Sequence, residues 1–333
     1  MKTAIATAEA VEPSRPVRRA AAPTAPGAGS GSWFADFIFA RGRIKVRQTG
    51  ADLPLDQALI GEALIWSGYH LIVRARSWWM ALRRPRALRI WFAPHTPRPW
   101  YMIWSAMAWG GVRIARSPEE ADAVFAFEDT TWRAPVTPPR LPAFNIRCAD
   151  ISKSRVAEVF ERVFGYPLAV DPQTWSGPAV CKGEANGVHD GCVVMCPTAP
   201  VEGSHHQRLI DTREGEFTFD LRTACIGGAP VVVWKKRKAA ADGFSIHNLS
   251  VTSHDPAAVF SPAELERIGA FLQAMHLDWA GLDILRDRHS GLIYVVDVNT
   301  TDVGPIIALS LADKLRSTAL LSAALQRMLQ RGR

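Results

Sequence analysis

The segment from Leu277 to Pro305, LDWAGLDILRDRHSGLIYVVDVNTTDVGP, limits the fold more than any other part of the sequence. It contains two apolar, strand-like stretches, with Asp283 in the first and Asp297 in the second. Asn299 follows Asp297 by two residues, and side chains alternate between the faces of a strand, so both project from one face. Oxygen ligands grouped in this way suit Mg²⁺, which proteins bind through one or two carboxylates and substrate phosphates. A plain strand end followed by an Asn-containing turn is the alternative interpretation.

Helical patterns alternate with strand-like ones through most of the chain. Two strands, Arg86–Pro94 and Ala121–Thr130, flank a helix at Pro99–Gly111, which predicts a small open α/β domain. A block of strand-like sequence follows at 178–238, with helical segments before and after it. These helical segments are Asp150–Gly165, Pro262–His276 and Ile306–Gln330. The order predicts a mixed α/β (α+β) fold.

Two lysines stand where phosphate contacts are common. Lys182 ends a strand and precedes a loop that contains Gly183 and Gly187, and the backbone amides of such a loop approach phosphate oxygens closely. No Gly-Lys-Ser/Thr sequence opens a helix here, so this is not a Walker loop. Lys153 lies at the positively polarised start of the preceding helix. A surface hairpin beside a solvated lysine is the simpler alternative for either position.

Three further polar residues of this loop have two interpretations. Glu184, His189 and Asp190 could shape a substrate pocket or could be solvated loop residues, and we favour the solvated state. Histidines 205, 206 and 247 are expected to be structural.

The order of sequence motifs along the chain resembles that of the ATP-grasp superfamily, and most of all that of its glutathione-synthetase-like and glutamate-ligating branch. Eight short motifs carry the resemblance, over about residues 145–310. They are Lys153 in ADISKSR, Lys182 in VCKGEANG, Gln207–Asp211 in HQRLID, Asp220 with Arg222 in FDLRTACIGG, the basic run ending VVVWKKRK, Asn248 in FSIHNLS, Asp283 in GLDILRD, and Asp297 with Asn299 in VVDVNTT. Residues 88–140 match the small α/β domain that usually precedes this fold. The family's strand usually carries Glu-x-Asn, whereas this chain has the shorter Asp297.

The resemblance implies an ATP- and Mg²⁺-dependent ligase that joins a carboxylate to an amine, or to a thiol, through an acylphosphate. The predicted substrates are a small-molecule or peptide carboxylate and an amine nucleophile, and the predicted products include ADP and phosphate. The implied ATP-binding residues are Lys153, Lys182, Gly183, Gly187, Gln207, Arg208, Leu209, Ile210 and Asp211. The implied ligands of Mg²⁺, with two ions expected, are Asp283, Asp297 and Asn299. The implied catalytic residues are Arg222, Arg237 and Asn248.

The charge distribution argues against a nucleic-acid-binding protein. The net charge is +7, but the first 100 residues hold 15 basic and 6 acidic residues and the remainder holds 24 and 26. A chain-wide nucleic-acid binder would spread its basic surface. The predicted organisation is a disordered tail at 1–32, a basic Trp/Arg-rich helical segment at 33–87, a small α/β domain at 88–144, and an ATP-grasp domain at 145–333 with lobes at 145–206 and 207–333.

Seven of the chain's 12 tryptophans lie between Trp66 and Trp109, interleaved with arginines. One interpretation is a peripheral contact of residues 55–90 with an anionic membrane surface. The other is a helix packed on the protein body, with arginines over tryptophans. We favour packing, because a strand follows at Leu88.

Two function classes compete with a cytoplasmic ligase. One is a non-catalytic nucleotide-binding protein that kept the fold. The other is a peripheral membrane ligase that acts on a lipid-linked envelope or polysaccharide substrate. No apolar run reaches the roughly 20 residues of a membrane-spanning helix. The five cysteines are an odd number, which indicates reduced thiols and a cytoplasmic location, with membrane association as the alternative.

Overall fold

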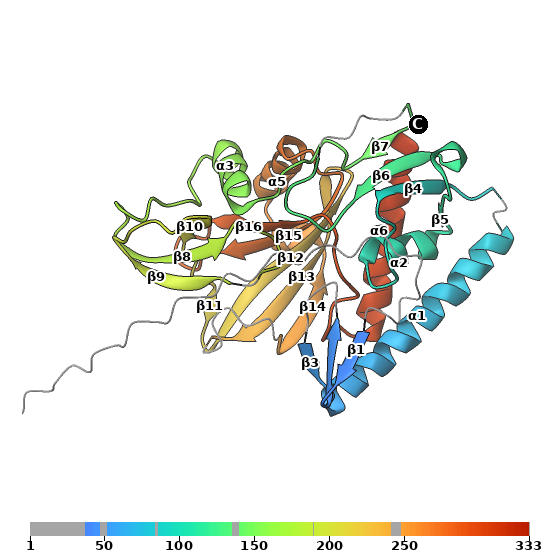
Figure 1. Ribbon diagram of the computed structural model, residues 1–333, viewed down its shortest axis with the longest axis horizontal. Helices are drawn as coiled ribbons and strands as arrows, with labels where there is room; N and C mark the ends of the chain where they lie inside the picture. The colour runs from blue at the N-terminus through green and yellow to red at the C-terminus, as the bar shows by residue number, and fades with distance from the viewer. Residues whose placement is uncertain are drawn as a thin grey trace, which may run out of the picture.

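The computed structural model describes residues 37–46, 52–83, 86–134, 140–188, 190–240 and 248–332. Over these residues the chain is a mixed α/β protein whose strands form four sheets. Figure 1 shows the largest sheet in the middle of the molecule, with helices on both of its sides. The tail predicted at 1–32 lies outside the described residues.

The N-terminal part of the described chain begins with strands, where a helical segment was expected. β1 (Phe37–Ala40), β2 (Arg43–Val46) and β3 (Asp52–Pro54) form an antiparallel sheet. Arg41 and Gly42, between β1 and β2, have φ of 50° and 69°, which is typical of a tight type I′ hairpin. Gly42 at the second turn position is the local feature that favours a two-residue hairpin, and a purely helical interpretation of residues 33–87 misses it.

The helix expected in this segment follows the small sheet. α1 (Gln57–Arg83) packs against α2 (Met102–Gly110) and α6 (Leu311–Arg331). Tyr69 and Val73 of α1 are buried in this contact. No helix among the described residues is both long and apolar enough to cross a membrane.

The small α/β unit expected at 88–144 contains a parallel sheet. Its strands are β4 (Arg89–Pro94), β5 (Arg113–Ile114), β6 (Ala123–Phe127) and β7 (Ala143–Phe144), in the order β5-β4-β6-β7. All five residues of β6 are buried, as is usual for a parallel strand that is covered on both faces. Gly111 ends α2 with a left-handed φ of 72°.

The largest sheet is antiparallel and has the order β14-β13-β12-β15-β16, with β11 paired to β12. Its strands are β11 (Arg213–Glu214), β12 (Phe217–Ile226), β13 (Ala229–Ala239), β14 (Ser250–His254), β15 (Trp279–Arg286) and β16 (Ile293–Asn299). The helices α3 (Lys153–Phe164) and α5 (Pro262–Ala274) cover one face, and α2 and α6 cover part of the other. The short α4 (Pro256–Val259) lies between β14 and α5.

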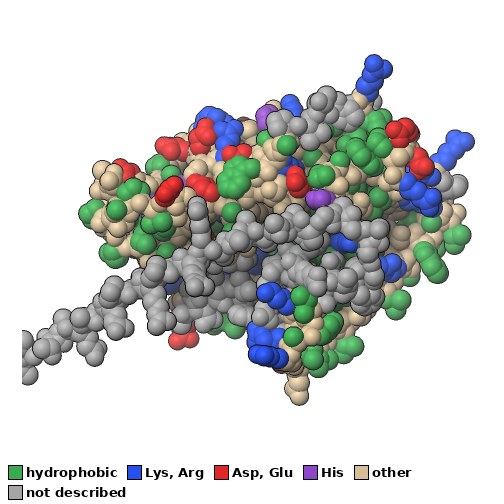
Figure 2. Space-filling view, in the orientation of Figure 1, with side chains coloured by type: hydrophobic (Ala, Val, Ile, Leu, Met, Phe, Trp, Pro, Cys, Tyr) green, Lys and Arg blue, Asp and Glu red, His purple; other side chains and the backbone are tan. Residues whose placement is uncertain are grey.

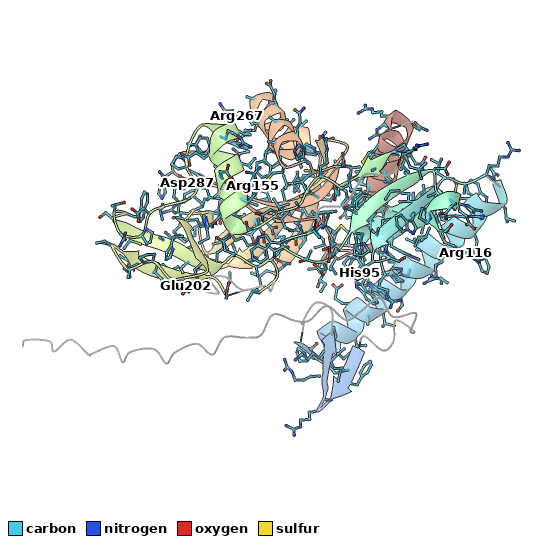
Figure 3. The ribbon with its side chains drawn as sticks, turned by 45° about the horizontal axis from the view of Figure 1, so that its top comes forward. His95, Arg116, Arg155, Glu202, Arg267 and Asp287 are labelled. Carbon is cyan, nitrogen blue, oxygen red and sulfur yellow. The ribbon has the colours of Figure 1, made fainter. Side chains whose placement is uncertain are left out.

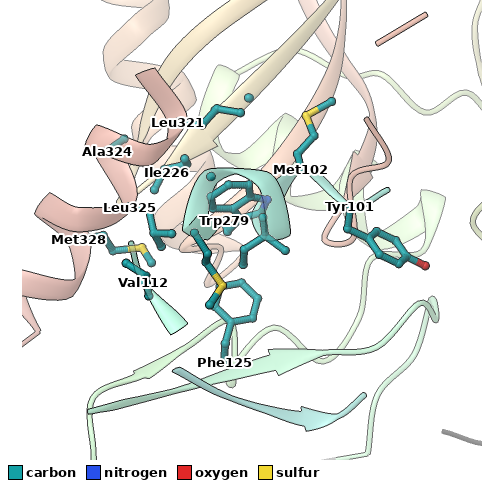
Figure 4. Close-up of a cluster of buried hydrophobic side chains, with 14 of the residues drawn as sticks. Tyr101, Met102, Val112, Phe125, Ile226, Trp279, Leu321, Ala324, Leu325 and Met328 are labelled. Atoms are coloured by element: carbon teal, nitrogen blue, oxygen red, sulfur yellow. The ribbon is translucent and has the colours of Figure 1, made fainter. Parts of the chain in front are cut away.

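Two hydrophobic cores lie on the two faces of this sheet. Figure 4 shows part of the first core, in which Ile226 and Trp279 of the sheet lie among residues of α2 and α6 such as Met102 and Leu325. In the second core Leu221 of β12 packs with α3 and α5. Because adjacent residues of a strand point to opposite faces, one apolar strand supplies both cores.

A smaller antiparallel sheet stands at the end of the molecule away from α1 (Figure 1). It has the order β10-β8-β9, from β8 (Gly177–Gly183), β9 (Cys192–Cys196) and β10 (Ser204–Arg208). Figure 3 marks its position by Glu202, two residues before β10, and marks the first turn of α3 by Arg155. The glycine-rich loop at 183–191 joins β8 and β9, and lies close to the start of α3.

Candidate active site

Three strands of the largest sheet place one basic and two acidic side chains in a row. Arg222 of β12 is paired with Asp283 of β15, and Asp283 is paired with Asp297 of β16. Directly paired residues of antiparallel strands share a face, so the three side chains point to the same side. Asn299 is paired with Gly281, two residues farther along each strand, and shares that face. The register therefore brings together four residues that the sequence analysis singled out, namely Arg222, Asp283, Asp297 and Asn299.

Arg222 is the buried cation of this row. Its Nη1 donates to Asp283 Oδ2 at 2.7 Å, and its Nη2 donates to Asp302. With its amide oxygen facing the guanidinium, Asn299 accepts from Nη1 and Nη2 at 2.9 and 3.0 Å. Burial alone would lower the pKa of Arg222, but Asp283 and Asp302 outweigh burial and raise it above its ordinary value.

The pKa values of the two carboxylates beside Arg222 are shifted in opposite directions. Burial would raise the pKa of Asp283, but Arg222 and Lys236 outweigh it and hold this pKa well below its usual range. Burial does raise the pKa of Asp302, although Arg222 opposes the shift. The Asp302 side chain is 1% exposed and that of Asp283 is 25% exposed, so Asp302 is the more deeply buried partner of Arg222.

Asp302 is a site residue that the sequence-based interpretation missed. Its carboxylate fills the space above Gly281, where a Cβ atom would lie 2.2 Å from Asp302 Oδ1. Gly281 is therefore required by a close approach between side chain and strand. The only sequence signal was an acid three residues after Asn299, in a stretch that otherwise has the composition of a turn.

Lys153 reaches the row from the first turn of α3. Ser152 caps the helix and accepts from Arg155 N at 3.4 Å. Lys153 is 6% exposed, forms an ion pair with Asp297, and donates to Asn186 Oδ1 at 3.0 Å. The helix start thus carries a cation to the edge strand β16, next to the predicted metal ligands.

Lys182 approaches the same edge from β8. Its Nζ donates to the carbonyl oxygen of Val296 at 2.8 Å. Burial lowers the pKa of Lys182 to about 8, and Asp297 partly opposes that shift. Lys153 therefore contacts Asp297 and Lys182 contacts the residue before it, so two lysines from different elements lie at this edge of the sheet.

The glycine-rich loop has a defined conformation at both predicted glycines. Gly183 N donates to the carboxylate of Asp190 at 3.0 and 3.2 Å, and a Cβ on Gly183 would lie 2.5 Å from Asp190 Oδ2. Gly187 has a φ of +75°, which disfavours other residues. Between them Asn186 N donates to Thr131 Oγ1 at 2.7 Å, and its side chain lies 2.7 Å from that of Asn299. The loop therefore lies over the row.

Of the two described acidic residues of this loop, Glu184 is half-buried and hydrogen-bonded, whereas Asp190 is exposed, as the favoured solvated interpretation expected. Glu184 accepts from Ser154 N at 3.0 Å and from Ser154 Oγ, at the start of α3. Asp190 is exposed but holds Gly183. A carboxylate at a helix N-terminus satisfies amides that lack partners within the helix, which explains the contact of Glu184. His189 lies outside the described residues.

The predicted ATP-binding segment Gln207–Asp211 begins in the last two residues of β10. Gln207 is buried and paired with Val180, and Arg208 N donates to Leu168 O at 2.9 Å. The Arg208 guanidinium lies 5.0 Å from the Trp175 ring centroid. Leu209 and Ile210 follow the strand, and Leu209 is 42% exposed.

Asp211 is held by arginines outside the row. Its Oδ2 is 2.7 Å from Arg213 and 2.9 Å from Arg288. The hydrogen bond from Arg213 holds the pKa of Asp211 well below its usual range. In the described part of the chain, its carboxylate has no contact with Asp283, Asp297 or Asn299.

Arg237 lies on the wrong face for its predicted role. In the register of β12 and β13, Arg237 is paired with Phe219, whereas Arg222 is paired with Trp234. Arg237 therefore points away from Arg222, and its guanidinium lies 4.4 Å from the Phe217 ring centroid. The side chain of the neighbouring Lys236 points instead to the face of the sheet that carries Arg222.

Lys236 and Lys238 point to the face of the sheet that carries the row. The sequence analysis did not separate them from the other basic residues of WKKRK. Lys236 Nζ is 3.8 Å from Asp283 Oδ1, and Lys238 forms an ion pair with Asp220. Burial lowers the pKa of Lys236, and Asp283 opposes the shift. Every second residue of the basic run therefore faces the row.

Among the described residues, Asn248, His205 and His206 take no part in the ion pairs of the row. Asn248 Oδ1 is buried and has no hydrogen-bond partner among the described residues. His205 Nδ1 lies 3.3 Å from Ser154 Oγ, and burial and the nearby Lys182 lower its pKa to about 4. His206 is buried in β10, and its carbonyl oxygen accepts from Val170 N at 3.0 Å. His247 lies outside the described residues.

The donor set of the row fits Mg²⁺. No group of three or more His, Cys, Asp or Glu side chains that could hold a metal occurs among the described residues. Mg²⁺ needs fewer protein ligands, because it binds through one or two carboxylates and keeps substrate phosphates and water. Asp283 Oδ1 is buried without a hydrogen-bond partner in the described structure, although Lys236 is near, so it retains a lone pair for a cation. Asp283, Asp297 and Asn299 are therefore a chemically suitable set.

No protein-family model matches the chain, and no curated protein matches its sequence. Among solved structures, the ATP-grasp ligase PsnB in complex with a minimal precursor is 12% identical, with a TM-score of 0.46, over 73% of this chain and 99% of that one. D-alanine–D-alanine ligase from Bacillus anthracis, complexed with ATP, is 14% identical, with a TM-score of 0.43, over 74% and 99%. A RimK domain ATP-grasp protein from Sphaerobacter thermophilus is 13% identical, with a TM-score of 0.42, over 71% and 99%. At such values the similarity concerns the arrangement of elements and carries nothing about the reaction.

Proposed function

We propose that this chain is an ATP-dependent ligase that activates a carboxylate as an acylphosphate. The observation that supports this most strongly is the row itself. Cations from three elements, Lys153, Lys182 and Arg222, surround Asp283 and Asp297 beneath a glycine-rich loop. A triphosphate with Mg²⁺ carries charges of both signs, and fixed side-chain charges of both signs stabilise such a ligand where water is excluded.

In this proposal each group has one task. Lys153 and Lys182 bind ATP phosphates, while the loop at Gly183 and Gly187 covers them with backbone amides. Asp283, Asp297 and Asn299 would hold Mg²⁺, which when bound neutralises charge on the β- and γ-phosphates. Adenine would lie against the backbone that follows β10, at Leu209 and Ile210.

The proposed reaction has two steps. An oxygen of the substrate carboxylate attacks the γ-phosphorus, and the bond from that phosphorus to the ADP oxygen breaks, which gives an acylphosphate and ADP. An amine, or a thiol, then attacks the acyl carbon, loses its proton, and expels phosphate. Arg222 lies where it would balance charge on the transferred group, so the protein contributes positioning and electrostatics rather than a covalent intermediate. Residues 88–144 and 145–333 would act as the preceding domain and the ATP-grasp domain.

Product analysis tests this proposal. Purified chain is incubated with ATP, Mg²⁺ and panels of carboxylates and amines, and nucleotide products are separated. We expect ADP and phosphate to appear in equal amounts and only when both co-substrates are present. Release of AMP and pyrophosphate would contradict the acylphosphate. Nucleotide binding with no turnover in any panel would support the alternative of a non-catalytic nucleotide-binding protein.

A matched pair of variants ties the reaction to the row. Lys153→Ala removes a buried cation that contacts Asp297, and should abolish product formation. Arg162→Ala removes an exposed arginine from the same helix, and should leave the rate unchanged. Equal rates in both variants would contradict the assigned site.

A further inference from the structure

The outer face of α1 exposes large apolar side chains along most of its length. Leu71, Trp78 and Leu82 are 70%, 80% and 85% exposed. The exposed apolar residues of this face are Ile60, Leu64, Ile65, Leu71, Ile72, Trp78, Trp79 and Leu82. Figure 1 shows α1 along the outer edge of the molecule, so these side chains form a surface at the periphery. A continuous exposed apolar surface of this kind marks an interaction site.

Packing against the protein body explains only the opposite side of this helix. Tyr69, Val73 and Met80 are buried against the body, and Tyr69 Oη is 2.7 Å from Thr318 Oγ1 of α6. The packing interpretation favoured from the sequence is therefore correct for the inner side. It leaves the outer apolar face without a partner among the described residues.

The charges of α1 have one sign on the outer side. The helix contains a single carboxylate, Glu62, which accepts from Lys314 Nζ at 3.2 Å and from Ala308 N at 3.1 Å of the body. Arg74 and Arg83 are exposed; the Arg83 guanidinium lies 4.1 Å from the Trp79 ring centroid, and the Arg74 guanidinium lies 5.1 Å from the ring centroid of Trp104 in α2, at the border between the outer face and the body. Along the lower right edge in Figure 2, where α1 lies, the coloured side chains are hydrophobic or basic. The outer face thus combines apolar and cationic groups.

The hairpin before α1 extends this surface. Leu55 N donates to Gly42 O at 2.8 Å, which fastens the hairpin to the chain at the start of the helix. Phe39 is 69% exposed, and Arg41 and Lys45 are also exposed. The hairpin repeats the combination of an apolar side chain with cations.

We propose that α1 and the preceding hairpin form a docking surface for an anionic lipid bilayer. The apolar side chains would enter the headgroup region, with indoles at the level where tryptophan is most stable. Arg74 and Arg83 would meet lipid phosphates while their aliphatic stems stay among the apolar groups. This surface is independent of the proposed reaction, and the row of charged residues lies on the other side of the α2 and α6 layer.

Charge favours a lipid surface over a second copy of the chain. A helix pair formed by two α1 faces would bring arginines together, and Glu62 points inward and could not pair with them. An anionic bilayer supplies negative charge and an apolar layer together.

Vesicle flotation of the full chain tests the proposal. Vesicles of phosphatidylcholine alone are compared with vesicles that also contain phosphatidylglycerol. We expect the chain to float with the anionic vesicles, and binding to fall at least about tenfold with neutral vesicles or raised salt. A triple variant, Leu71→Ser, Trp78→Ser and Leu82→Ser, should lose anionic binding by about tenfold or more. Met195→Ser, at a side chain 67% exposed on β9, is the matched control and should float like the wild type.

Two further measurements keep the outcome interpretable. Circular dichroism and thermal unfolding should show that the triple variant folds normally, because its replaced side chains face outward. Double replacement Arg74→Gln and Arg83→Gln should weaken anionic binding only. No flotation of the wild type, or equal flotation of the triple variant, would overturn the proposal. A dimer in sedimentation equilibrium that disappears in the triple variant would assign the face to a second copy and overturn it as well.

Discussion

The row of charged residues on the largest sheet and the outer face of α1 depart from the usual distribution of side chains in opposite ways. In the row, the side chain of Arg222 is 11% exposed and that of its partner Asp302 is 1% exposed, although charged groups normally stay in water. On α1, Trp78 and Leu82 are 80% and 85% exposed, although large apolar side chains are normally buried away from water. Buried charges that pair with one another, and apolar side chains that are left exposed by the described residues, indicate different ligands. These features are the basis for proposing a polyanion with its counter-ion as the ligand of the first region and an amphipathic surface as the ligand of the second.

Removal of the central cation should have the largest effect on stability. Arg222→Met leaves Asp283 and Asp302 buried without their main partner, and loss of one member of a buried ion pair costs about 3–5 kcal/mol. Denaturant unfolding of the variant should show a decrease of this order. Arg162→Ala, which removes an exposed partner of Glu158 within α3, should change the free energy of unfolding by less than about 0.5 kcal/mol. Equal effects would mean that the row is as solvated as the protein surface.

Substitutions on the two sides of α1 should differ sharply. Met80 is 8% exposed and faces the body, so Met80→Ala should lower the free energy of unfolding by about 2–3 kcal/mol. Leu71 is 70% exposed, so Leu71→Ala should change it by no more than about 0.5 kcal/mol. Unfolding curves of both variants without lipid provide the comparison. A large loss in Leu71→Ala would show that the outer face is covered within the protein, and would remove the contrast.

Acid should weaken the contact between α1 and the body. Burial and the nearby Arg74 lower the pKa of His70 to about 4, and neither ring nitrogen has a hydrogen-bond partner among the described residues. The unfolded chain, with an ordinary pKa near 6.5, binds this proton more readily. The contribution of His70 is therefore fully present above pH 6.5 and is lost as the pH falls toward 4.

The size of this loss is about 3 kcal/mol between pH 7 and pH 4. His70→Phe should reduce the acid sensitivity of the free energy of unfolding by that amount, while His205 and the carboxylates remain common to both proteins. Identical pH profiles for wild type and variant would indicate that His70 is protonated or solvated in the folded chain.

Sequence periodicity was sufficient to predict much of the fold and part of the row. Asp297 and Asn299 share a face because strands have a period of two, and the register adds Asp283 and Arg222 to them. Periodicity cannot say which face of a strand meets which neighbour, so Arg237 was chosen where Lys236 faces the row. A one-residue difference of this kind reverses every side chain of a strand.

Long-range contacts account for what was missed. Asp302 is recognisable only once the turn after β16 folds back over Gly281. Glu184 was assigned to solvent because its partner, Ser154, is distant in sequence and becomes adjacent only when α3 meets the loop. The hairpin at Arg41 and Gly42 had a local signal, but the tryptophans and arginines after it dominated the interpretation of the segment.

Calorimetric titration of MgATP and MgADP into the purified chain tests the central claim most directly. We predict binding that requires Mg²⁺ and that weakens at least about a hundredfold in Lys182→Met and in Asp297→Ala, since both remove charge from a buried site. Met195→Ser, which changes a residue on the same small sheet as Lys182, should bind like the wild type. Wild-type affinity in both folded site variants, or binding that is indifferent to Mg²⁺, would contradict the assignment of the row to a metal-bound nucleotide.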